Sequence, residues 1–306
     1  MKPYFYDMMV AIGVTSPKWI QVFEQEFKKD PMVVQSAQKL KEAIDRLNEE
    51  YPAMKAPSYQ QSDLLDRMQA HYIRYDWMVK QGCFFLSPEE PGYPDIMYRM
   101  DRTTGSRRGH FYPGVIYCKG DRRLLTKRIQ ILFCSEQPHG KEVRPALTAI
   151  IKAMQAADCH PIIPLAFFTS WTLIEACLQA DLAPIVILDR GIDYYLQSGD
   201  PTERETIEQV LQRGGVIMTN LPVGEVKPLT FPNQHRFYFM YALATRMHVI
   251  QLSHKDNSRF LLEAALRHGV RVCVLQQQAP PPMYTDYYRK LPTLVQVFPL
   301  NEWLHL

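Results

Sequence analysis

The chain has 306 residues, 46% of them hydrophobic, which is enough to bury a full core and to form two domains. It has no apolar run of ~20 residues, and its first residues carry an acidic side chain and no signal-peptide cleavage site. These features exclude a membrane span and predict a cytoplasmic protein. The formal net charge is only +3, yet the basic residues are unevenly distributed.

The cysteines and histidines give no sign of a metal centre. The six cysteines are scattered, none belongs to a Cys-x-x-Cys pair, and most lie in apolar runs. We therefore expect reduced, buried cysteines. The histidines have no ligand spacing such as His-x-x-x-His on a helix, and there is no glycine-rich nucleotide motif, so no metal and no cofactor are expected. The cysteines are Cys83, Cys118, Cys134, Cys159, Cys177 and Cys273.

Residues 1–80 are predicted to form a helical N-terminal domain. Ser16-Pro17 has the pattern of a helix N-cap followed by proline at the first helical position. Apolar residues then recur three or four positions apart in three successive segments, which is typical of amphipathic helices. The residues expected to face the core are Trp19, Phe23, Phe27, Val33, Val34, Ala37, Leu40, Ile44, Leu47, Leu64, Leu65, Met68, Tyr72 and Tyr75.

A strongly basic segment, residues 99–128, follows a short apolar strand near residue 84. It holds nine basic and two acidic residues, so its charge of +7 leaves the rest of the chain at −4. Such a cluster indicates a surface that binds polyanions, although a solvated loop would have the same composition. The basic residues are Arg99, Arg102, Arg107, Arg108, Lys119, Arg122, Arg123, Lys127 and Arg128, and the acids are Asp101 and Asp121.

Strands and helices alternate through the next 150 residues. The apolar strand runs lack strict alternation, which indicates burial on both faces, and regular alternation with helices predicts a doubly wound, mostly parallel, Rossmann-like α/β sheet. We assign this domain to residues 81–275 and a C-terminal tail to 276–306. The strand runs are 129–134, 161–165, 184–188, 216–219, 248–252 and 270–275, with helices near 142–157, 170–180, 202–213, 235–245 and 257–268.

The stretch 214–236 has the features of a ligand loop. Gly214-Gly215 ends a helix, a strand follows, and a loop rich in proline and glycine leads to Arg236 at the start of the next helix. Doubly wound sheets bind ligands at the carboxyl ends of their strands, and a helix N-terminus lined with donors suits phosphate.

Two motifs carry a resemblance to a known family. The triplet Lys119-Gly120-Asp121 follows an apolar strand and precedes a leucine, and Phe231-Pro232 is followed four positions later by Arg236. This pattern resembles the DNA-processing protein A (DprA) family, whose members bind single-stranded DNA and load a recombinase on it. The resemblance implies a Rossmann-like fold, a homodimer, and a DNA-binding crevice close to the Lys119-Gly120-Asp121 turn.

The chain departs from the family at its pocket signatures. Cys134 stands where the family has glycine, and Glu136 stands where it has arginine, so an anion replaces a cation that would meet phosphate. Pro164 and Phe168 replace two glycines of the second signature. Other signature positions hold Ser170, Ile174 and Asn257-Ser258. The tail is too short for the winged-helix domain with which many members end.

We therefore expect a non-catalytic DprA-like protein that binds DNA, single-stranded DNA in particular, with no catalytic residues. Glu175 and His254-Lys255-Asp256 are weak catalytic candidates, because a solvated helix face and a surface loop explain them as well. The expected phosphate contacts are Lys119, Arg122, Arg123, Lys127 and Arg128, with Arg236 and Arg259 at the rim of the crevice.

Two other functions remain open at this point. One is a protein-interaction scaffold that binds no nucleic acid, and the other is a sensor or hydrolase of a nucleotide derivative. The resemblance also implies a specialised member that acts as antitoxin, or as regulator of a toxin or effector protein, in a bacterial anti-phage module. The apolar residues 237–241 could belong to the core or to a homodimer interface.

Overall fold

The computed structural model divides the chain into two compact units, Met1–Cys118 and Lys119–Leu306. The domain limits 1–80, 81–275 and 276–306 inferred from the sequence stay predictions. The structure describes residues 2–12, 17–29, 35–52, 59–87, 93, 115–134, 143–165, 169–227, 239–250, 258–276 and 295–299.

The first unit is helical, with a short antiparallel strand pair. In the pair, Phe84 is in register with Cys118, and Leu86 with Ile116. Its elements are α1 (Lys2–Ala11), α2 (Pro17–Lys29), α3 (Ala37–Glu50), α4 (Gln61–Lys80), β1 (Phe84–Leu86) and β2 (Ile116–Gly120), the last of which runs into the second unit.

The predicted inward faces are partly right. All the expected core residues of α3 are buried, and the side chain of Ser36 caps this helix at the backbone N–H of Lys39. In α4 the expected stripe is wrong at two positions, because Leu65 is 47% exposed and Tyr72 is 63% exposed. The buried face follows helical spacing more closely, through Leu64, Met68, His71 and Met78.

A buried polar cluster ties the helices of the first unit to β2. The carboxylate of Asp7 accepts a hydrogen bond from the hydroxyl of Tyr117 at one oxygen and contacts Nε2 of His71, 2.6 Å away, at the other. Asp7 is 5% exposed and His71 3% exposed. Burial, together with the negative charge of Asp7, raises the pKa of Tyr117 far above its ordinary value, so the phenol stays a hydrogen-bond donor.

The second unit is built on a parallel sheet, as the sequence predicts. Its strands lie in the order β6-β5-β4-β3-β7-β8-β9, and each neighbouring pair is parallel. The doubly wound α/β fold is thus confirmed. The strands are β3 (Arg128–Cys134), β4 (Cys159–Pro164), β5 (Ile185–Ile187), β6 (Val216–Thr219), β7 (Arg246–Ile250), β8 (Arg271–Gln276) and β9 (Val295–Pro299).

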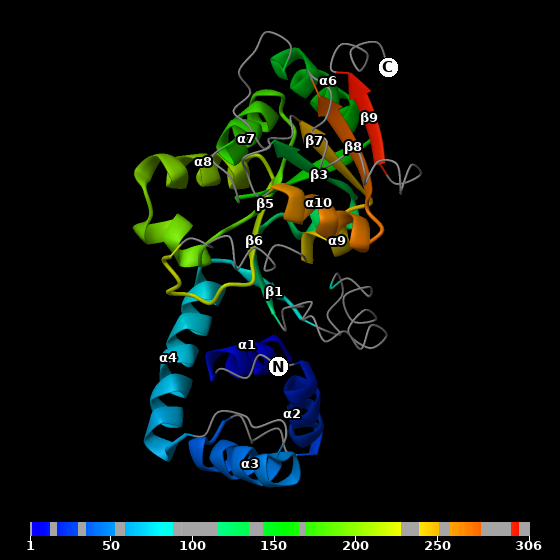
Figure 1. Ribbon diagram of the computed structural model, residues 1–306. Helices are drawn as coiled ribbons and strands as arrows, with labels where there is room; N and C mark the ends of the chain where they lie inside the picture. The colour runs from blue at the N-terminus through cyan, green and yellow to red at the C-terminus, as the bar shows by residue number, and fades with distance from the viewer. Residues whose placement is uncertain are drawn as a thin grey trace. The chain divides into compact units, whose positions relative to one another are not determined.

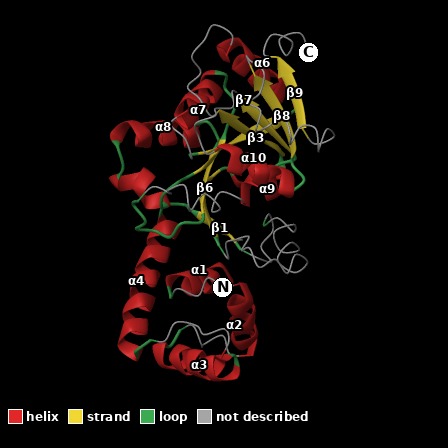
Figure 2. Ribbon diagram, viewed as in Figure 1, coloured by secondary structure: helices red, strands yellow, loops and turns green. Residues whose placement is uncertain are grey.

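Helices cover both faces of this sheet (Figures 1 and 2). From β3 to β6 the chain moves steadily in one direction, and from β7 to β9 it moves in the other. Because parallel crossovers are right-handed, the helices of the two halves pack on opposite faces. The helices are α6 (Val143–Ala156), α7 (Thr169–Gln179) and α8 (Pro201–Gln212) in the first half, and α9 (Phe239–Leu243) and α10 (Ser258–Arg267) in the second.

The tail contributes a strand that sequence analysis left outside the sheet. β9 pairs in parallel with β8, with Val272 in register with Val295. The segment 237–241 is also clarified in part, because Phe239, Met240 and Tyr241 are buried within the chain itself and the hydroxyl of Tyr241 donates to the carbonyl of Leu261, 2.7 Å away. These three residues belong to the core, and the homodimer stays a prediction.

The start of β6 is shaped by three glycines. Gly214 adopts φ +77° and ends α8, where the N–H of Gly215 donates to the carbonyl of Val210, 2.8 Å away. Gly120, at the end of β2, adopts φ +123° and lies against Gly215, whose carbonyl accepts from the N–H of Asp121 at 3.3 Å. The Lys119-Gly120-Asp121 turn therefore lies beside the residue that precedes β6.

All six cysteines are buried and free, in line with the sequence analysis. No helix of the described ranges is long and apolar enough to cross a membrane. In those same ranges, no group of three or more histidine, cysteine, aspartate or glutamate side chains could hold a metal ion.

A buried histidine in β7 predicts a pH dependence of stability. His248 is 3% exposed, and its Nε2 lies 2.8 Å from Oε1 of Gln130 on β3. Burial, aided by the positive charge of Arg246, lowers the pKa of His248 to about 4. Because the unfolded chain takes up this proton near pH ~6.5, the contribution of His248 to stability is fully present above that pH and is lost as the pH falls toward about 4.

Lowering the pH from about 7.5 to about 4.5 should thus cost about 2–3 kcal/mol at this one site. Urea unfolding of the parent and of His248→Gln at both pH values measures the difference, since the other titrating groups are common to both chains. An equal loss of stability in the two chains would contradict the assignment.

Candidate nucleic-acid interface

The strand ends of the parallel sheet form two surfaces. We call the surface at the carboxyl ends of the strands the carboxyl edge and the surface at their amino ends the amino edge. β3 lies between β4 and β7, and the chain winds in opposite directions from it, so the topological switch point is at the carboxyl ends of β3 and β7. These strands end at Cys134 and Ile250. The loops that follow, 135–142 and 251–257, lie outside the described residues, and so do Glu136 and His254-Lys255-Asp256.

At the described part of this carboxyl edge, two hydroxyl groups donate hydrogen bonds to carbonyl oxygens at the strand ends. Thr169 donates its hydroxyl hydrogen to the carbonyl of Cys134, and Ser170 donates to the carbonyl of Pro164, 2.7 Å away. Both residues are buried at the start of α7. Ser170 stands where the family signature has aspartate, and here it anchors a helix to a strand end.

A charged cluster lies at the carboxyl end of β5. Asp189 accepts a hydrogen bond from the hydroxyl of Tyr195, and burial raises the pKa of Asp189 above its ordinary value. Arg190 pairs with Glu203 at 3.3 Å, and its guanidinium lies 4.1 Å from the ring centroid of Tyr194. The guanidinium of Arg190 is thus paired with a carboxylate, while its buried Nε has no hydrogen-bond partner within the described residues.

The basic segment lies at the opposite, amino edge of the sheet. Arg128 is the first residue of β3, and the short 3-10 helix Arg122–Thr126 leads into that strand. The expectation that Lys119-Gly120-Asp121 lies close to the switch-point crevice is wrong, because residues that precede a parallel strand lie at its amino end. A strand of seven residues at ~3.3 Å per residue separates the two edges by about 20 Å.

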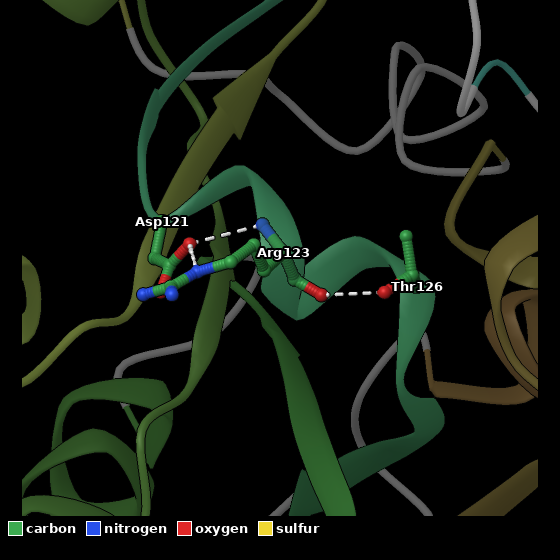
Figure 3. A network of polar contacts seen from close by, with 3 residues as sticks. All are labelled: Asp121, Arg123 and Thr126. Carbon is green, nitrogen blue, oxygen red and sulfur yellow. Dashed lines mark hydrogen bonds and ion pairs between the residues drawn. The ribbon is translucent and has the colours of Figure 1, made fainter.

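Arg123 is held by Asp121, two residues before it (Figure 3). The guanidinium donates from Nη2 at 2.7 Å and from Nε at 3.0 Å, and the backbone N–H of Arg123 donates to the same carboxylate at 3.0 Å. The side-chain hydrogen bond from Arg123, followed by the backbone one, lowers the pKa of Asp121. The side chain of Arg123 is nevertheless 88% exposed, so the pair remains open to solvent.

The other cations of the segment differ in their surroundings. Lys127 pairs with Asp158 at 2.8 Å, because the register of β3 with β4 places the residues before the two strands side by side. Arg122 and Arg128 are exposed. Lys119 is half-buried and lines a pocket of about 470 Å³ with Tyr195 and α8, including Arg204, Glu205 and Glu208.

The structure does not bring every candidate together. Arg236 lies outside the described residues, and of Arg259 only the backbone, near the start of α10, is described. Glu175 is exposed on α7, which favours the interpretation as a solvated helix residue. The described part of the predicted interface is therefore Lys119, Arg122, Arg123, Lys127 and Arg128, all at the amino edge.

Two further arginines lie at this edge and were not predicted from the sequence. Arg246 is the first residue of β7 and Arg271 the first residue of β8, and both are exposed. Each stands immediately before an apolar strand run, which is the signal that could have found them. More than 100 residues separate them from the basic segment, so a count of charge along the sequence does not join them to it.

A doubly wound parallel sheet with helices on both faces and a switch point at its centre defines a Rossmann-like α/β protein. No protein-family model matches the chain, and no curated protein is similar to it in sequence at a significant level.

Comparison with solved structures makes the class more specific. The chain is similar to DNA processing protein A (DprA) from Streptococcus pneumoniae, with a TM-score of 0.67 and 14% identity over 99% of this chain and 97% of that one. It is also similar to DprA from Helicobacter pylori, with a TM-score of 0.52 and 15% identity over 73% of this chain and 94% of that one. The second structure concerns the single-stranded DNA binding mode of that protein. At such identities the likeness shows that the chain shares the DprA fold.

Proposed function

We propose that this chain binds single-stranded DNA through the phosphate backbone and catalyses no reaction on it. The observation that supports the proposal most strongly is the DprA fold over nearly the whole chain, since a DprA of the same fold binds single-stranded DNA. A second support is the exposed, basic amino edge, because clustered exposed cations attract polyanions.

The absence of catalysis is part of this proposal. It is supported by three described polar side chains near the carboxyl edge that have partners within the protein. Thr169 and Ser170 donate to strand-end carbonyls, and Arg190 pairs with Glu203. A hydrolase would need a carboxylate or hydroxyl available to a substrate.

Replacing Arg122, Arg123, Lys127 and Arg128 together by alanine tests the proposal. Affinity for a labelled single-stranded oligonucleotide should fall at least about tenfold, and equally for different base sequences, because phosphate contacts carry no sequence information. Titrations followed by fluorescence anisotropy measure this effect. The fold should survive, since exposed ion pairs such as Lys127–Asp158 contribute ~1 kcal/mol or less.

A control variant must also lose four positive charges, but from another part of the surface. The cations of α3 and α4 allow this with Lys39→Ala, Lys41→Ala, Arg46→Ala and Lys80→Ala. We expect its affinity to stay within about twofold of the parent. If both variants bind DNA as the parent does, the amino edge is a solvated face and DNA is bound elsewhere; if the parent itself binds no DNA, the scaffold function is preferred.

We also propose that the protein regulates a toxin or effector in an anti-phage module, as an antitoxin. This proposal is supported by the resemblance and by the altered signature positions Cys134 and Pro164, which suit a specialised member of the fold. If the gene beside the one for this chain encodes a toxic product, co-expression of the two should abolish that toxicity. Unchanged toxicity would leave the DNA-binding proposal untouched and remove this one.

A further inference from the structure

Three neighbouring strands of the sheet each begin with an exposed arginine. Arg128 opens β3, Arg246 opens β7 and Arg271 opens β8, and these strands are adjacent in the order β3-β7-β8. We call these three residues the arginine row. The three strands lie side by side in Figures 1 and 2.

The strand register places the row on one face of the sheet. Arg246 is in register with Arg271 on β8 and with Gln130 on β3. In parallel strands, residues in register point to the same face, and Arg128 shares the face of Gln130 because it lies two positions earlier. At ~4.8 Å between strands, Arg246 and Arg271 are neighbours on adjacent strands, and Arg128 lies two residues, about 7 Å, before the register partner of Arg246.

Arg246 acts electrostatically on the same face of the sheet. Its positive charge contributes to lowering the pKa of His248 and opposes the rise that burial causes in the pKa of Cys273. His248 and Cys273 are register partners two residues further along β7 and β8. Both effects agree with the face that the register assigns to Arg246.

Among the described residues, the ion pairs of the amino edge lie on one side of the sheet. Toward β4 and β5, Lys127 pairs with Asp158, and Arg213 pairs with Asp181. Within the described ranges, no carboxylate forms an ion pair with Arg246 or Arg271. Neighbouring cations without counter-charges repel one another, and a bound anion removes that repulsion.

We propose that the arginine row binds the phosphates of single-stranded DNA and extends the interface of residues 119–128 across β7 and β8. This inference rests on the proposed function. It adds Arg246 and Arg271 to the interface and specifies that the interface continues from β3 toward β8. Guanidinium groups bind phosphate with two parallel hydrogen bonds, and three neighbouring strands place such groups next to one another at the same edge.

The double variant Arg246→Ala/Arg271→Ala tests the row in the full chain. If each arginine contacts one phosphate, the slope of log affinity against log salt should flatten by about 1.4, using ~0.7 per contact. At ~0.1 M salt that change corresponds to a loss of affinity of about 10- to 30-fold. Arg213→Ala is the matched control, because Arg213 is an exposed arginine of the same edge that already has an acidic partner, and its slope should not change.

Further measurements separate the possible failures. Arg246→Lys/Arg271→Lys keeps both charges, so it should retain the parent slope even if the alanine variant folds poorly. If the parent binds DNA and the alanine variant has the parent's slope and affinity, the row is overturned while the proposed function stands. If the parent binds no DNA, both fail. Equal binding of poly-glutamate, with the same dependence on the row, would overturn the nucleic-acid assignment in favour of an acidic protein.

Discussion

Gly120→Ala should destabilise the second unit by about 3 kcal/mol or more. This is the largest effect that we expect from a substitution that removes no side-chain functional group. Gly120 has φ +123°, which side-chain-bearing residues rarely adopt, and a Cβ there would lie 2.1 Å from the carbonyl oxygen of Gly215 and 2.9 Å from Cα of Val216. Both obstacles are backbone atoms, so the strain cannot be relieved by a rotamer change. Urea unfolding followed by circular dichroism measures the loss.

Gly214→Ala is the matched control for that measurement. Gly214 also has a positive φ, +77°, but a Cβ there meets nothing within 4 Å. Only the left-handed backbone conformation is penalised, at about 1–2 kcal/mol. If the two variants lose the same stability, the close approach of Gly120 to Gly215 is not the reason that the Lys119-Gly120-Asp121 triplet requires a glycine.

Asp7→Ala should destabilise the first unit by about 3–5 kcal/mol. The substitution leaves the hydroxyl of Tyr117 and Nε2 of His71 without the carboxylate that both contact, and the cluster is almost fully buried. Removing one partner of a buried polar cluster is costly, because the remaining groups cannot recover their hydration. The unfolding transition of the N-terminal helices reports this change.

Asp45→Ala provides the comparison in the same unit. Asp45 pairs with Lys41 one turn away on α3, and its side chain is 43% exposed. A pair of this kind contributes about 0.5 kcal/mol or less. A loss of stability at Asp7 as small as that at Asp45 would mean that the buried cluster is dispensable.

Most of the secondary structure of the second unit follows from its periodicity. The strand 216–219 is found as predicted, and α6 and α7 each begin or end within one residue of their predicted limits. These elements are recognisable because their apolar runs are separated by glycine, proline and polar turns. β9 was placed in no sheet, because five residues after a proline-rich stretch carry little periodicity.

The site was harder to predict than the fold, because it depends on which end of each strand a residue occupies. Lys119-Gly120-Asp121 was assigned to the crevice through the family resemblance, yet the chain enters β3 just after it and so lies at the amino edge. Arg246 and Arg271 join that edge only through the pairing of β3, β7 and β8. Strand order is a long-range property that a single sequence does not specify.

The salt dependence of single-stranded DNA binding by the unaltered chain tests the central claim most directly. If the five predicted residues Lys119, Arg122, Arg123, Lys127 and Arg128 contact phosphates, log affinity should fall against log salt with a slope of about −3.5, from ~0.7 per contact. Participation of Arg246 and Arg271 would steepen the slope to about −4.9. A slope near zero, or no binding at low salt, would contradict the account.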